Sequence, residues 1–190
     1  MQNALKKNGF SRRGIIYLKN GDPRTAFQWC GERTVFRELT GDDDAIVARL
    51  VRSNLEKAGL DIPGTVYFDE ALDHLSDIYG KDDSRYFVLE DKTGKVIGGI
   101  GFARFPHMEN TAELQKLYLD DEAKGFGLGY KMVYFIEEQM RKAGFSRSYL
   151  ETHDNLKTAI HVYENSGYRE TDRPAEVVHG TMNRFFVKDL

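Results

Sequence analysis

Three glycines at alternate positions are the feature of this sequence best suited to take part in chemistry. Gly125, Gly127 and Gly129 lie in the stretch AKGFGLGYKM, directly before apolar residues at helical spacing. Glycine has no Cβ atom, so the N–H groups of such a stretch can approach a ligand closely, and those that begin a helix have no intrahelical acceptor. A phosphate group is a common partner of these N–H groups. The sequence therefore predicts a phosphate-binding turn within residues 123–132.

Two well-known nucleotide motifs fit this turn poorly. A P-loop requires Gly-Lys followed by Ser or Thr, whereas Lys131 is followed by Met132. A dinucleotide fingerprint requires Gly-x-Gly-x-x-Gly directly after the first strand of the fold, whereas this spacing is Gly-x-Gly-x-Gly and several predicted strands precede it. Glu151, at the end of the next predicted strand, is placed where a ribose-binding acid would be expected. A nicotinamide-dependent dehydrogenase therefore stays as a minor alternative.

The elements that must position the turn follow from hydrophobic periodicity and from breaker residues. Helices are predicted at residues 40–59, 69–80, 128–143 and 155–167. Thr40 and Asp43 have capping-box spacing at the start of the first helix, and Phe68, Leu72, Leu75 and Tyr79 share one predicted face at the second. Strands are predicted at residues 34–39, 85–91, 96–105, 111–120, 146–152 and 180–190.

This order, β-α-α-β-β-β-α-β-α-β, predicts a fold of the α/β (α+β) class. We expect one domain, with a mixed, mostly antiparallel sheet of about six to seven strands flanked by helices. The crossover that contains the glycines should be right-handed and join parallel strands. Residues 34–190 form this predicted domain. Residues 1–33 show little periodicity and are interpreted as an N-terminal extension of unknown role, in which RGIIYLK is a short strand.

Two sequence blocks resemble the GNAT superfamily of N-acetyltransferases. The first, AELQKLYLDDEAKGFGLGYKMV, contains a turn similar to the family pattern Arg/Gln-x-x-Gly-x-Gly/Ala, with Lys124 departing from it at the first position. The second, LETHDNLKTAIHVYENSGYRE, is similar to the family block in which Asn begins a helix and Tyr ends it before Gly-Tyr. The matching positions of the second block are Asn155, Ala159, Tyr163, Gly167 and Tyr168. The resemblance covers residues 34–190.

The resemblance implies that acetyl-CoA is the cosubstrate. The backbone from Lys124 to Tyr130 would hold the pyrophosphate, and the strand before it would pair with the pantetheine arm, with an N–H near Leu119 polarising the thioester carbonyl. Lys131, Arg141 and Lys157 are interpreted as ordinary helix-surface charges, any one of which could meet the 3′-phosphate. The cofactor-binding residues implied are Leu117, Tyr118, Leu119, Lys124, Gly125, Phe126, Gly127, Leu128, Gly129, Tyr130, Asn155 and Tyr163.

The implied reaction is direct attack of an amine on the acetyl thioester. Tyr163 matches the family's tyrosine acid, which protonates the departing thiolate; the alternative is that it only fills the apolar face of its helix. Glu113 matches the strand position of the family's base, and strand alternation puts it on the same side as Gln115 and Leu117. The alternative for Glu113 is a solvated acid at a strand end. His107 and Glu109 are weaker candidates for the base.

Composition limits the other possibilities. A net charge of −3 argues against nucleic acid as a partner, and no apolar run is long enough to span a membrane. The five histidines lack metal-ligand spacing, and the lone Cys30 fits a reducing cytoplasm. We therefore predict a cytoplasmic, metal-free N-acetyltransferase acting on a primary amine of a small molecule or peptide. The alternative is a catalytically silent acyl-CoA sensor. The acyl group, acetyl or longer, and the oligomeric state, monomer or homodimer, stay open.

Overall fold

The computed structural model describes residues 10–17, 23–29, 34–175, 177 and 180–190. The chain divides into two compact units, Met1–Thr34 and Val35–Leu190. In the first unit, β1 (Phe10–Tyr17) and β2 (Pro23–Trp29) form an antiparallel hairpin. The short strand predicted in RGIIYLK falls partly in β1, while its last two residues lie outside the described residues. The β2 strand was not predicted, and Cys30 lies outside the described residues.

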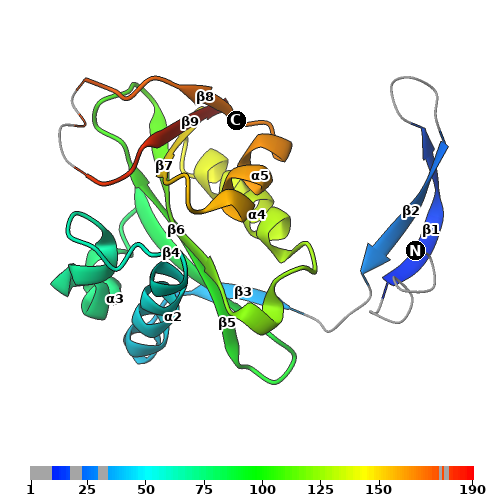
Figure 1. Ribbon diagram of the computed structural model, residues 1–190, viewed down its shortest axis with the longest axis horizontal. Coiled ribbons are helices and arrows are strands. Elements are labelled where there is room, and N and C mark those ends of the chain that lie inside the picture. The colour runs from blue at the N-terminus through cyan, green and yellow to red at the C-terminus, as the bar shows by residue number, and fades with distance from the viewer. Residues whose placement is uncertain (1–9, 18–22, 30–33, 176, 178–179) are drawn as a thin grey trace. The chain divides into compact units, whose positions relative to one another are not determined.

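The second unit is built on a seven-stranded sheet in the order β3-β4-β5-β6-β7-β9-β8 (Figure 1). Only β6 and β7 are parallel neighbours in this sheet, and its other pairs are antiparallel. The predicted mixed, mostly antiparallel sheet and the parallel crossover are thus confirmed. The strands are β3 (Val35–Glu38), β4 (Ser84–Glu90), β5 (Val96–Arg104), β6 (Thr111–Leu119), β7 (Arg147–Thr152), β8 (Arg169–Thr171) and β9 (Arg184–Asp189).

Helices cover both faces of this sheet. Figure 1 shows α2 (Asp44–Lys57) and α3 (Leu75–Ile78) on one face, and α4 (Leu128–Lys142) with α5 (Lys157–Asn165) on the other. The predicted capping box is present at the turn before α2, where the Asp43 carboxylate accepts hydrogen bonds from the Thr40 backbone N–H at 2.9 Å and from the Thr40 hydroxyl at 2.8 Å. Apolar residues at helical spacing on α2, such as Val47, Val51 and Leu55, are buried against the sheet.

Two predicted elements differ from the structure. The helix predicted at residues 69–80 is instead a 3₁₀ helix (Glu70–His74) followed by the single turn of α3. Leu72, Leu75 and Tyr79 are buried as predicted, but Phe68 is 60% exposed because it ends a separate 3₁₀ turn, Val66–Phe68. The β8 strand was missed because it contains only three residues at the edge of the sheet.

A bulge interrupts β6 in the centre of the sheet. The pairing of β5 with β6 shifts between Gly99 and Gly101, and on β6 Lys116 has a φ of 50°, which is unusual for a residue other than glycine. Tyr86 of β4 lies across the two glycines and donates a hydrogen bond of 2.9 Å from its hydroxyl to the carbonyl of Lys116. The glycines therefore make room for the side chain that holds the bulge.

This contact predicts a measurable cost for the smallest side chain at Gly99. A Cβ atom there would lie 2.4 Å from the Tyr86 hydroxyl oxygen, so Gly99→Ala should lower the free energy of unfolding by about 1–3 kcal/mol through overpacking. Gly41→Ala is the matched control, because its Cβ atom would meet only the Ser76 hydroxyl at 3.7 Å and should cost less than about 0.5 kcal/mol. Urea denaturation measures the free energy of unfolding of both variants. Equal values for the two would show that the Tyr86 side chain does not lie against Gly99.

Candidate active site

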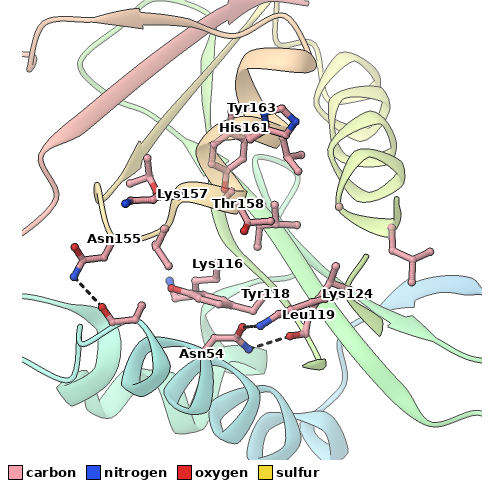
Figure 2. A pocket seen from close by; sticks show the side chains of 18 of the residues that line it. Asn54, Lys116, Tyr118, Leu119, Lys124, Asn155, Lys157, Thr158, His161 and Tyr163 are labelled. Atoms are coloured by element: carbon pink, nitrogen blue, oxygen red, sulfur yellow. Dashed lines mark hydrogen bonds between the residues drawn. The ribbon is translucent and has the colours of Figure 1, made fainter. Parts of the chain in front are cut away.

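The two parallel strands separate, and a cavity lies beyond the point where they part. β6 pairs with β7 only at Thr111–Glu113 and Arg147–Tyr149, so the rest of β6 has no strand partner on that side. A cavity of about 640 Å³ is lined by residues of α2, β6, the glycine turn, β7 and α5 (Figure 2). Unpaired backbone groups in such a gap can bind an extended chain as an added strand would.

The glycine turn presents the start of α4 to this cavity. Gly125 and Gly127 have φ angles of 82° and 76°, which glycine adopts without strain, and Gly127 caps α4. The N–H groups of Leu128, Gly129 and Tyr130 form the first turn of the helix and have no intrahelical acceptor. The turn thus has the geometry and the partial positive charge of an anion site.

Gly129 has a separate reason to be glycine. A Cβ atom at this position would lie 3.4 Å from a methyl group of Val162, so the absence of a side chain lets α4 approach α5 closely. This approach brings α5, with Tyr163, to the same cavity as the glycine turn. The alternate glycines therefore have different roles: two shape the turn and one sets the distance between the helices.

Lys124 is held by partners beside the turn. Its Nζ donates to the Asp121 carboxylate at 2.6 Å. It also donates to the Asn54 side-chain oxygen at 2.7 Å (Figure 2). Asn54 in turn donates to the carbonyl of Leu119 at 3.0 Å, which connects α2 to the end of β6. Lys57 also pairs with Asp121. The Lys124 charge is thus already balanced by a carboxylate, and its side chain has a positioning role between α2, β6 and the turn.

Tyr163 brings a hydroxyl group to the cavity from α5. The residue is only 5% exposed, and its ring lies 5.9 Å from that of Tyr168. Within the part of the chain that the structure describes, its hydroxyl forms no hydrogen bond. Burial raises the pKa of the Tyr163 hydroxyl well above its ordinary value, so the group stays protonated at neutral pH and can donate a proton.

Glu113 belongs to a chain of hydrogen bonds that ends at the cavity. Gln115 donates to the Glu113 carboxylate at 2.7 Å, and the Tyr79 hydroxyl donates to the Gln115 oxygen at 2.6 Å. The Lys116 amine lies 3.4 Å from the Tyr79 hydroxyl and lines the cavity. Burial raises the pKa of the Glu113 carboxyl, the hydrogen bond from Gln115 opposes this, and the nearby charge of Glu151 adds to it.

The end of β7 adds polar groups to the same cavity. Glu151 accepts a hydrogen bond of 3.0 Å from the Tyr149 hydroxyl, and burial raises the pKa of its carboxyl. Thr152 is 2% exposed, and its hydroxyl has no hydrogen-bond partner among the described residues. Asn155 donates from its side chain to the carbonyl of Ala58 at 2.8 Å, which ties the start of α5 to the end of α2 (Figure 2).

The structure brings together most of the predicted site residues. Of the predicted cofactor-binding residues, only Phe126 does not line the cavity. Of the predicted catalytic residues, Tyr163 lines it, whereas Glu113 does not and is hydrogen-bonded to Gln115. Among the three cations considered for the 3′-phosphate, only Lys157 lines the cavity, while Arg141 pairs with Glu138 and Lys131 lies over the ring of Phe36. His107 and Glu109 are exposed and do not line it.

The sequence did not predict a role for Asn54, Tyr79, Lys116 or Thr152. Regular alternation would place Lys116 on the face opposite Gln115, yet both side chains reach the Tyr79 hydroxyl because the bulge interrupts the alternation. The glycine pair at Gly99 and Gly101 is the sequence signal that could have indicated this bulge. Alternation alone therefore does not place Leu117 on the same side as Glu113.

Neither a metal-binding cluster nor a membrane-spanning helix is found among the described residues. No group of three or more His, Cys, Asp or Glu side chains in this part of the chain is arranged to hold a metal ion. Among its helices, none combines the length and the apolar character needed to cross a membrane.

Comparison with known proteins relates this geometry to one family. A family model described as Acetyltransferase (GNAT) family matches residues 53–168. The uncharacterized N-acetyltransferase YjgM of Escherichia coli is 38% identical over 140 residues, which cover 73% of this chain and 83% of that protein.

Solved structures show the same fold. A GNAT-family acetyltransferase from Staphylococcus aureus superposes with a TM-score of 0.72 at 19% identity, covering 83% of this chain and 99% of the other. Spermidine N-acetyltransferase from Vibrio cholerae, in complex with CoA and spermine, has a TM-score of 0.62 at 20% identity, covering 82% of this chain and 95% of the other.

Proposed function

The chain belongs to the GNAT family of acetyl-CoA-dependent acyltransferases, and we propose that it transfers an acetyl group to a primary amine of a small molecule or peptide. One observation carries the proposal: the glycine turn, the unpaired part of β6 and the Tyr163 hydroxyl line one cavity. We assign the transferase activity to residues 34–190 and leave residues 1–33 as an extension of unknown role. The predicted cytoplasmic location and the absence of a metal are part of the same proposal.

In this proposal the cosubstrate lies along β6 with its phosphates at α4. The N–H groups of Leu128, Gly129 and Tyr130 bind the pyrophosphate, and the exposed Lys157 is the cation available to the 3′-phosphate. The pantetheine arm pairs with the backbone of Leu117–Leu119, where β6 has no strand partner on the side of β7. This arrangement puts the thioester near Tyr163 and the Lys116 bulge.

The transfer then needs a base and an acid. The acceptor amine loses a proton, attacks the thioester carbonyl carbon and forms the C–N bond while the C–S bond breaks. The protonated Tyr163 hydroxyl donates to the departing thiolate. Glu113, whose raised pKa makes its carboxylate a stronger base than an ordinary one, is the proposed base, and it acts through the groups between it and the cavity.

The base assignment predicts the pH dependence of the reaction. Only the deprotonated Glu113 carboxylate can accept a proton, so kcat/KM should fall as the pH decreases through the pKa of Glu113. Because this pKa is raised, the fall should be centred above the ordinary glutamate value of about 4.3. Glu113→Gln should remove this acidic limb and lower kcat by roughly 10²-fold or more. Rates measured from low to neutral pH with both proteins provide the check.

The variant Glu151→Gln distinguishes Glu113 from Glu151 as the source of the acidic limb. Because the charge of Glu151 raises the pKa of Glu113, this variant should keep the acidic limb and move it to lower pH. Lys116 acts on Glu113 in the opposite direction and is present in all three proteins. Loss of the limb in Glu151→Gln but not in Glu113→Gln would make Glu151 the base.

An acceptor screen tests the proposed function itself. Acetyl-CoA is incubated with the protein and with amino acids, polyamines, aminoglycosides or peptides with free N-termini, and free thiol is measured. The spermidine activity of the Vibrio cholerae relative supports including polyamines. We expect thiol release that depends on one class of acceptor. Absence of release with every acceptor, together with absence of acetyl-CoA binding, would contradict the proposal.

A further inference from the structure

Lys116 is a lysine inside the proposed active site that the proposed reaction uses neither as the acid nor as the base. It lies at the bulge of β6, where Tyr86 holds its carbonyl, and its side chain lines the cavity next to the proposed path of the pantetheine arm. Figure 2 shows it beside Tyr118, between Asn54 on one side and Thr158 and Tyr163 on the other in this view. The bulge thus directs a primary amine toward the region assigned to the thioester.

The surroundings of this amine are unusual for a partly buried lysine. Its Nζ lies 3.4 Å from the Tyr79 hydroxyl and 5.7 Å from the centre of the Tyr79 ring. Among the described residues, no carboxylate forms an ion pair with it, whereas the half-buried Lys188 is paired with Glu137 at 2.6 Å. The Tyr79 hydroxyl, which donates its own proton to Gln115, can accept from either the charged or the neutral form of the amine.

Electrostatics favour the neutral form of this amine. Burial lowers the pKa of Lys116, while the charges of Glu113 and Asp69 oppose the shift without reversing it. Compared with a lysine of ordinary pKa, a larger share of Lys116 is therefore present as the free amine, which is the nucleophilic form. Lys157, which lines the same cavity, is exposed to solvent.

We propose that Lys116 is a self-acetylation site, which takes the acetyl group from acetyl-CoA bound in the cavity when no acceptor is present. This inference depends on the proposed position of the cosubstrate. The Nζ lone pair attacks the thioester carbonyl carbon, a C–N bond forms and the C–S bond breaks. The electron pair of the broken bond goes to sulfur, and the proton that Nζ loses ends on the thiolate. The products are acetylated Lys116 and free coenzyme A.

Isotope-labelled acetyl-CoA tests this proposal. The full-length protein is incubated with acetyl-CoA that carries a deuterated acetyl group, without acceptor, and peptides are quantified by mass spectrometry over time. The deuterium distinguishes this transfer from any acetyl group acquired during expression. We expect label on Lys116 faster than on Lys157, because Lys116 lies at the β6 bulge beside the proposed path of the pantetheine arm and its lowered pKa favours the free amine. Equal or slower labelling of Lys116 would overturn the proposal.

Two variants and one binding measurement complete the test. Lys116→Arg should abolish the fast labelling seen in the intact mass, because a guanidinium group stays protonated. Gly127→Glu should abolish it as well, because the cosubstrate site is lost, while slow chemical labelling of exposed lysines continues. Heat protection by acetyl-CoA separates the two proposals: protection without Lys116 labelling refutes only self-acetylation. If acetyl-CoA gives no heat protection and Lys116 is not labelled, the proposed function and self-acetylation are both refuted.

Discussion

Replacing Gly127 by glutamate is expected to abolish the protection that acetyl-CoA gives the protein against heat. At a concentration near 100 times its dissociation constant, a ligand stabilises the folded state by about 2.7 kcal/mol, which raises Tm by roughly 5–11 °C in a protein of this size. Gly127 caps α4 with a φ of 76°, so a glutamate there brings bulk and negative charge to the first N–H groups of the helix. Both oppose a pyrophosphate, and the wild-type shift in Tm should disappear.

Gly144→Glu is the matched control for this variant. Gly144 lies just beyond the opposite end of α4, has a φ of 89°, and would present a Cβ atom to open space, as Gly127 would. Either glutamate costs about 1–2 kcal/mol of stability because its backbone must adopt a left-handed conformation. Thermal unfolding with and without acetyl-CoA should show loss of protection only in Gly127→Glu. Protection that survives in this variant would place the cosubstrate elsewhere.

Removing the hydroxyl of Tyr163 is expected to lower kcat by roughly 10²-fold or more, because the departing thiolate loses its acid. The Tyr163→Phe ring keeps its contacts with Tyr168 and Phe186, so folding and the binding of acetyl-CoA should change little. Thiol release is measured with the acceptor that the screen identifies. A kcat equal to that of the wild type would show that Tyr163 only packs on the apolar face of α5 and is not the acid.

Tyr168→Phe provides the comparison for this effect. Tyr168 is 4% exposed and its ring neighbours that of Tyr163, but its hydroxyl is paired with Ser148 at 2.8 Å and it does not line the cavity. Its removal should lower stability by about 1–3 kcal/mol through the unpaired Ser148 hydroxyl, with kcat preserved. If both variants lost kcat equally, the loss would reflect altered packing of α5 and not an acid.

Local patterns were sufficient to predict most of the fold. The strands from β4 to β7 alternate or carry long apolar runs, and α2, α4 and α5 have apolar faces that end at Gly59, Gly144 and Gly167, so each element could be predicted without its neighbours. The segment from Glu70 to Ile78 is different, because its 3₁₀ turns depend on packing of Leu72 and Leu75 under α2. The three residues of β8 form a strand only because β9 is available to pair with them.

The candidate site was predictable where its geometry is local. The glycine turn and the start of α4 depend on backbone conformations that the glycines themselves indicate. The position of Lys116 depends on Tyr86, which reaches it across β5, and no pattern within β6 contains that information. The same holds for Asn54 and Asn155, whose partners, Leu119 and Ala58, lie far from them along the chain.

A crystal structure of the protein with coenzyme A would test the central claim most directly. We expect the pyrophosphate on the N–H groups of Leu128, Gly129 and Tyr130, the arm along Leu117–Leu119, and the thiol within hydrogen-bonding reach of the Tyr163 hydroxyl. A thiol that lies away from Tyr163 and the Lys116 bulge, or a pyrophosphate bound outside the glycine turn, would contradict the account.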